Sequence, residues 1–128
     1  MSLRSPLGRV LGLGSAKGGS SHWYAQRVTA VALVLLGLWF FVSLASLEGS
    51  SLDAVRAWLS SPVSSVLAVL FVAVAAYHAN LGLRVVVEDY VASKGTRVAV
   101  LVAVKFALVV AALVGVLSVL RIAFGAPA

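Results

Sequence analysis

Three long apolar segments dominate this sequence. They span residues 23–47, 63–91 and 98–124, to within a few residues at each end. The hydrocarbon core of a bilayer is about 30 Å thick, and a helix needs about 20 apolar residues to cross it. A chain of 128 residues therefore has room for three spans and little else. We predict an all-α membrane protein with three transmembrane helices, forming a single membrane-anchor domain over residues 1–128.

The composition excludes an ordinary soluble domain. The chain is 62% hydrophobic and only 11% charged, whereas soluble domains are about half apolar and about a quarter charged. The excess apolar surface must therefore face lipid or other proteins of an assembly. The chain has no cysteine, which excludes a disulfide framework, thiolate-ligated iron–sulfur clusters and covalent haem attachment within it.

The basic residues are interpreted as topology signals and not as a nucleic-acid surface, because they flank the apolar spans. One side of the membrane would carry six of them: Arg4, Arg9, Lys17, Arg27, Lys94 and Arg97. The other side would carry Arg56 and Arg121. The excess predicts that the N-terminus is cytoplasmic or on the matrix side. Residues 1–22 then form a basic cytoplasmic arm that docks on a partner, although this composition also suits an organellar transit peptide.

The connections between the spans are short. Residues 48–62 combine apolar and charged side chains in a pattern that predicts a short amphipathic helix on the membrane surface. Pro62 suits the first position of the second span. Residues 93–96, read as Ser-Lys-Gly-Thr, predict a turn before the third span.

The second span carries the candidate chemistry, because ionisable residues inside a membrane are costly and usually functional. His78 lies in an otherwise apolar part of it, with Ala75 three residues before and Gly82 four residues after. These small neighbours leave space beside the imidazole for a flat macrocycle such as haem. They also suit close helix packing, in which His78 would hydrogen-bond a neighbouring helix.

The polar end of the second span holds Asp89 and Tyr90. Asp89 follows His78 by eleven residues, which places both on one helix face about 16 Å apart. A carboxylate and a phenol near an arginine can hydrogen-bond a quinone carbonyl and supply protons to the reduced ring. Arg84 and Glu88 are four residues apart and are expected to neutralise each other. Arg27 is interpreted as a topology anchor or as a partner of a haem propionate.

A second axial histidine for the same iron is not expected from this chain. The other histidine, His22, lies near the cytoplasmic boundary, and counting back from Tyr90 places His78 roughly 16–18 Å below that boundary. We therefore expect the second ligand of a bis-histidine haem to come from another protein of the assembly.

These motifs resemble a known family. The spacing His78-x3-Gly82-x6-Asp89-Tyr90-Val91 is similar to the second helix of the hydrophobic membrane anchor subunit of succinate dehydrogenase, respiratory complex II. The segment 26–30, Gln-Arg-Val-Thr-Ala, resembles the opening of its first helix, and the arm at 14–18 is similar to alphaproteobacterial members.

The resemblance implies a non-catalytic component of a quinone-reducing enzyme in a bacterial inner membrane, with the mitochondrial inner membrane as the less favoured alternative. Its partners would be a flavoprotein, an iron–sulfur protein and a second membrane protein of the cytochrome b type. His78 would be one axial ligand of a haem b held between the cytochrome b-type partner and this anchor, with Arg27 near a propionate. Ubiquinone would bind where those two membrane proteins meet the iron–sulfur protein, with Tyr90 bonding a carbonyl and Asp89 close by.

Three alternatives to this interpretation stay open from the sequence. The chain could be a fumarate reductase-type anchor, a small transporter or proton-conducting protein, or a purely structural anchor whose histidine is a packing residue. Tyr77, Arg84 and Glu88 depart from some family members.

Overall fold

The chain folds into three long helices and one short one. The computed structural model describes residues 19–47, 49 and 51–125. The helices are α2 (Gly19–Ala45), α3 (Leu52–Ser60), α4 (Pro62–Tyr90) and α5 (Lys94–Ala123). The described residues contain no strand. The predicted all-α fold is confirmed, while residues 1–18 of the predicted basic arm lie outside the described part.

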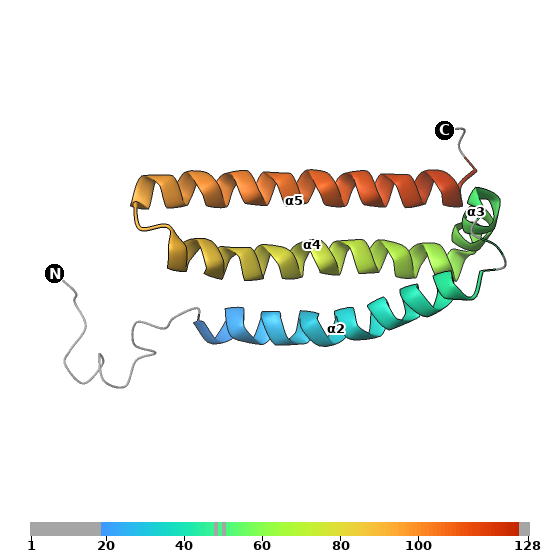
Figure 1. Ribbon diagram of the computed structural model, residues 1–128, viewed down its shortest axis with the longest axis horizontal. Helices are drawn as coiled ribbons and strands as arrows, with labels where there is room; N and C mark the ends of the chain where they lie inside the picture. The colour runs from blue at the N-terminus through green and yellow to red at the C-terminus, as the bar shows by residue number, and fades with distance from the viewer. Residues whose placement is uncertain (1–18, 48, 50, 126–128) are drawn as a thin grey trace, which may run out of the picture.

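The three long helices form a single layer of rods. Figure 1 shows α2, α4 and α5 running alongside one another, with α3 placed across the end where α2 finishes and α4 begins. The central rod, α4, packs against both α2 and α5. All three rods are long and apolar enough to cross a membrane, so this is a multi-pass membrane protein. Three crossings place the start of α2 and the end of α5 on opposite sides of the bilayer.

Most large apolar side chains point outward. Val34, Leu35 and Phe106 are each about two thirds exposed, at 68%, 66% and 67%. Burying such surface is the main favourable term of folding in water, so a chain that leaves it outside must have lipid or protein around it. The sequence-based expectation that the apolar surface faces lipid or other proteins agrees with this arrangement.

The short helix α3 forms where the amphipathic segment was predicted. The Ser51 side chain caps its start by accepting a hydrogen bond from the Ala54 amide at 3.2 Å, which satisfies one of the free N–H groups of the first turn. Asp53 and Arg56 form an exposed ion pair at 3.4 Å. Leu59 is buried, so α3 combines an exposed ion pair with an apolar side chain packed into the bundle.

An aromatic cluster joins three helices at the α3 end. Phe40 of α2 stacks on Phe71 of α4 with ring centroids 5.0 Å apart. Trp58 of α3 lies 5.6 Å from Trp39 and 5.8 Å from Phe40. Aromatic pairs at these distances are favourable beyond the area they bury. This cluster fixes α3 against the end of the α2–α4 pair.

Small residues set the closest approaches between the long helices. A Cβ added to Gly37 would lie 3.8 Å from the Phe71 ring across the α2–α4 contact. A Cβ added to Gly115 would lie only 3.0 Å from Val72 Cγ1 across the α4–α5 contact. Membrane helices generally associate through such small residues, and Gly37 and Gly115 both lie at helix contacts of this kind.

Two predicted boundaries were wrong by about one helical turn. Helix α5 begins at Lys94 and not near residue 98. The connection between α4 and α5 is therefore residues 91–93, and not the predicted turn at 93–96. The Arg97 amide bonds the Ser93 carbonyl at 2.9 Å, which makes Ser93 the N-cap and places Gly95 harmlessly in the first turn. Helix α2 likewise begins at Gly19 and not near residue 23.

Candidate functional site

His78 faces α2, and α2 supplies a partner to each of its ring nitrogens. Nδ1 lies 2.9 Å from the Thr29 hydroxyl oxygen, and Nε2 lies 3.3 Å from the Gln26 amide nitrogen. The side chain is half-buried between the two helices. The structure therefore places the imidazole at the α2–α4 contact and not in lipid.

The two partners hold the ring unequally. The Thr29 hydroxyl is fixed by the backbone of its own helix, because it donates to the Ala25 carbonyl at 2.7 Å. Gln26 makes the longer contact, and its Oε1 atom is buried without a hydrogen-bond partner among the described residues. A buried unsatisfied carbonyl costs about 1–3 kcal/mol, so the Gln26 side chain is the weaker of the two restraints.

The predicted space beside the imidazole is partly occupied. A Cβ added to Gly82 would lie 3.5 Å from the Gln26 amide nitrogen, so that amide rests against the glycine. The far end of a flexible glutamine therefore occupies the side of the ring that faces Gly82. Ala75 is half-buried on the same helix.

His22 lies nearer to the level of His78 than the sequence count predicted. The partners of His78 are Gln26 and Thr29, which follow His22 by four and seven residues. The separation along α2 is thus about 6–10 Å and not 16–18 Å. The difference arises because α2 starts short of the end of α4, as Figure 1 shows.

His22 nevertheless belongs to a different environment from His78. It lines a groove of about 610 Å³ between the start of α2 and the end of α4, with Tyr77, Arg84 and Glu88 among the other lining residues. Its Nε2 atom is buried and unpartnered among the described residues. Arg84 and Glu88 form the predicted ion pair, with Nε and Oε1 2.8 Å apart. The pair supports their assignment as residues that neutralise each other.

The predicted quinone residues lie at the exposed end of α4. Tyr90 is 82% exposed, and Asp89 is also exposed. Arg27 does not contact either of them in the described part of the chain; its guanidinium lies 5.4 Å from the centroid of the Trp23 ring. Within residues 19–47, 49 and 51–125, Asp89 and Tyr90 therefore form an open surface with no closed site around them.

The end of α4 also receives an arginine that the sequence marked only as a topology charge. The Arg97 side chain of α5 donates from Nε to the Val91 carbonyl at 2.9 Å. A cation near the C-terminus of a helix satisfies a free carbonyl and suits the helix dipole. Arg97 thus fixes the turn that follows Asp89 and Tyr90.

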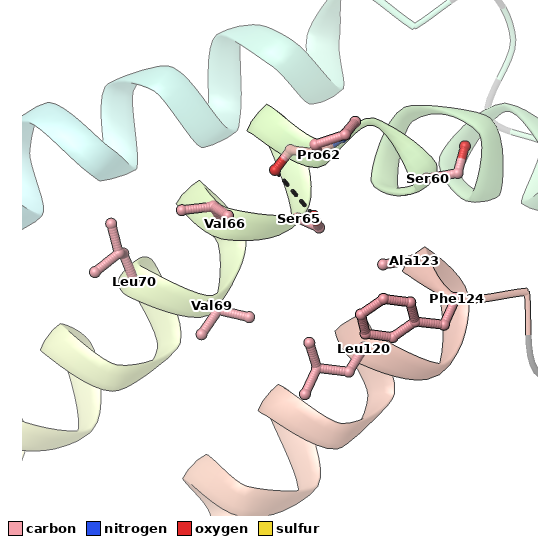
Figure 2. A pocket seen from close by; sticks show the side chains of 9 residues that line it. All are labelled: Ser60, Pro62, Ser65, Val66, Val69, Leu70, Leu120, Ala123 and Phe124. Atoms are coloured by element: carbon pink, nitrogen blue, oxygen red, sulfur yellow. Dashed lines mark hydrogen bonds between the residues drawn. The ribbon is translucent and has the colours of Figure 1, made fainter.

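A second cavity lies at the opposite end of the molecule. It has a volume of about 490 Å³ and lies between the start of α4 and the end of α5. Figure 2 shows apolar side chains, including Val69, Leu120 and Phe124, around it. Its buried serine, Ser65, donates to the Pro62 carbonyl at 3.0 Å. The lining offers little polar chemistry and suits an apolar occupant.

Comparison with known proteins gives one consistent family. A family model described as succinate dehydrogenase/fumarate reductase transmembrane subunit matches residues 1–114. The succinate dehydrogenase hydrophobic membrane anchor subunit of Rickettsia bellii is 35% identical over 102 residues, which cover 80% of this chain and 82% of the relative. The protein of the same name from Paracoccus denitrificans is 36% identical over 91 residues, covering 71% of this chain and 70% of the relative.

Proposed function

This chain belongs to the family of succinate dehydrogenase/fumarate reductase transmembrane subunits, and on that basis we propose that it anchors a succinate:quinone oxidoreductase in the membrane. In this proposal it also supplies one axial ligand to haem b and part of the ubiquinone site. The relatives named above are all succinate dehydrogenase subunits, which favours succinate oxidation over fumarate reduction. The observation that carries the proposal is the imidazole of His78, held between two membrane helices.

The residues around His78 fit an axial ligand of haem b. An imidazole is a usual protein ligand of haem iron. Here one ring nitrogen is bonded to a fixed hydroxyl, and the other meets only the weakly held Gln26 amide. When bound, haem b supplies a one-electron redox centre within the membrane. This chain's part is to hold the imidazole at a fixed depth and to keep one ring nitrogen available.

The second axial ligand is proposed to come from the cytochrome b-type partner. In the described part of the chain, His22 lines a separate groove with Arg84 and Glu88 and does not share a contact with His78. The exposed apolar faces of α2, α4 and α5 offer the surface that such a partner would cover. Arg27 is exposed at the same end of the bundle and is available to an anionic group such as a propionate.

The ubiquinone site is proposed to form when the partner proteins cover the end of α4. Tyr90 and Asp89 are adjacent in sequence and both exposed there. The phenol can donate a hydrogen bond to a quinone carbonyl, and the carboxylate can accept and release protons. The iron–sulfur protein and the flavoprotein would bind on this side and deliver electrons taken from succinate.

Purification of the chain from its own membranes tests this proposal. An affinity-tagged chain extracted in mild detergent is expected to bring with it a flavoprotein, an iron–sulfur protein and a second membrane protein. The preparation should reduce ubiquinone with succinate and show a b-type spectrum after reduction by dithionite. Recovery of the chain alone, or in a complex without a flavoprotein, would contradict the proposal.

We further propose that the N-terminus is cytoplasmic, so that α3 lies on the outer side and the turn at 91–93 on the inner side. The chain has no cysteine, so single-cysteine variants report topology without background. We expect Ala57→Cys, exposed on α3, to react with a membrane-impermeant thiol reagent in intact cells. Ala92→Cys, exposed in the turn, should be protected. The reverse labelling pattern would invert the assigned orientation.

A further inference from the structure

Thr29 connects the imidazole of His78 to the backbone of α2. Its hydroxyl oxygen lies 2.9 Å from His78 Nδ1, 2.7 Å from the Ala25 carbonyl oxygen and 3.2 Å from the Gln26 carbonyl oxygen. A hydroxyl has one proton to donate and lone pairs to accept with. When the hydroxyl donates to the nearer carbonyl, that of Ala25, its oxygen is left to accept from Nδ1. Nδ1 must then carry the ring proton.

Gln26 selects the same tautomer through a different atom. Its amide nitrogen faces His78 Nε2 at 3.3 Å, and an amide nitrogen can only donate. Nε2 must therefore carry the lone pair and not the proton. The opposite tautomer would require the Thr29 hydroxyl to turn away from Ala25 and the Gln26 amide to invert. Two side chains thus agree on a neutral imidazole protonated at Nδ1.

We infer that Thr29 is a positioning residue that holds His78 with its proton on Nδ1 and its lone pair on Nε2, the nitrogen available to iron. This inference rests on the proposed role of His78 as a haem ligand. Histidines that bind metals usually donate their second N–H to an acceptor, which fixes the tautomer and the ring orientation and makes the ligand more basic. Thr29, backed by the Ala25 carbonyl, provides that acceptor here.

The Gln26 amide lies over His78 Nε2 and must move aside for iron to reach that nitrogen. The amide lies against Gly82, its contact with the ring is long, and the Gln26 Oε1 atom is buried without a partner in the described part of the chain. Moving the Gln26 side chain breaks only its long hydrogen bond to His78 Nε2, and it allows the buried Oε1 atom to find a hydrogen-bond partner. Moving Thr29 would break a chain of two short bonds. The hydrogen bond between Thr29 and Nδ1 therefore keeps the ring in place when the Gln26 amide moves away from Nε2.

The tautomer can be measured without haem. The full chain, labelled with 15N-histidine in lipid nanodiscs, contains two histidines, and a His22→Gln variant assigns the His78 signals. We expect the protonated ring nitrogen to be Nδ1 in the unsubstituted chain and in Thr29→Ser, which keeps the hydroxyl. Thr29→Val, which has nearly the same shape without the hydroxyl, should give a mixture or the opposite tautomer. Gln26→Leu should retain Nδ1–H, because Thr29 is intact.

The haem midpoint potential in the purified complex gives the second readout. Without the Nδ1–H bond the imidazole is a weaker donor to ferric iron, so Thr29→Val should raise the potential. We expect about a tenfold higher ratio of reduced to oxidised haem at a fixed ambient potential, which equals about 59 mV for a one-electron couple. Thr29→Ser should return the ratio to that of the unsubstituted complex.

Two results would overturn the inference. One is an Nε2–H tautomer in the unsubstituted chain, and the other is a Thr29→Val variant with unchanged tautomer and unchanged potential. A complex that lacked haem altogether would defeat the proposed function instead. In that case the nitrogen spectrum of the chain alone would still decide whether Thr29 fixes the imidazole. If Thr29→Val failed to assemble while Thr29→Ser assembled, the spectrum of the haem-free chain would decide in the same way.

Discussion

Replacing His78 with alanine is expected to abolish the normal b-type α-band of dithionite-reduced membranes. The change removes the one imidazole that α4 places between the long helices. The nearby Gln26 amide and Thr29 hydroxyl are poor replacements, because haem iron in proteins is held by histidine, cysteine, methionine or tyrosine side chains. We expect complete loss of haem or a shifted spectrum of haem held from one side only.

His22→Ala is the matched control for this experiment. It removes the other histidine of the chain, which lines the groove beside Arg84 and Glu88. We expect the spectrum to be retained in this variant. A normal spectrum in His78→Ala together with a lost one in His22→Ala would show that the ligand had been assigned to the wrong histidine. Normal spectra in both variants would leave this chain without a haem ligand.

Tyr90→Phe is expected to lower succinate-dependent ubiquinone reduction by about 100-fold, at the lower end of what positioned acid–base groups contribute. The substitution keeps the ring and removes only the hydroxyl that would bond the quinone. Tyr90 is 82% exposed, so loss of its hydroxyl is expected to leave the packing of the described helices, and hence assembly, unaffected. Succinate oxidation by a soluble artificial acceptor should be unchanged, because those electrons leave before the membrane site.

Tyr24→Phe separates a specific role of Tyr90 from a general effect of losing an interfacial tyrosine. Tyr24 is 66% exposed near the start of α2, at the same end of the bundle. We expect its variant to reduce ubiquinone at the normal rate. Normal turnover in both variants would remove Tyr90 from the proposed quinone site. An equal loss of turnover in both would indicate a disturbed membrane boundary.

Local features of the chain were predictable because they depend on neighbours in sequence. Apolar runs of sufficient length gave the three long helices, and Pro62 marked the start of α4 as expected. The spacing of Arg84 and Glu88 gave their ion pair. The start of α5 was missed because Gly95 reads as a turn signal, whereas the first turn of a helix tolerates glycine once Ser93 accepts the Arg97 amide.

The partners of His78 could not be predicted in the same way. Gln26 and Thr29 are three residues apart and lie on one face of α2, which is a usable signal for a polar site. Residues 30–42 of α2 are apolar on every side, however, so amphipathicity does not indicate which face meets α4. The register between the two helices depends on contacts such as Gly37 against Phe71, which become visible only in three dimensions.

Family membership bears on the alternatives left open by the sequence. A proton-conducting or transporting protein needs polar residues along several of its spans. In the described part of the chain His78 of α4 is instead matched by Gln26 and Thr29, and Arg84 is paired with Glu88. These paired polar groups, together with the succinate dehydrogenase relatives, favour a membrane anchor over a transporting protein. A purely structural histidine is the alternative that the His78 spectrum addresses.

A density map of the purified complex tests the central claim most directly, because it shows what occupies the side of His78 that Gln26 covers in this chain. We predict haem iron bonded to His78 Nε2, the Gln26 amide displaced, and Nδ1 still within hydrogen-bond distance of the Thr29 hydroxyl. An iron held by two imidazoles of other proteins in the complex, with His78 still packed against Gln26, would contradict the claim.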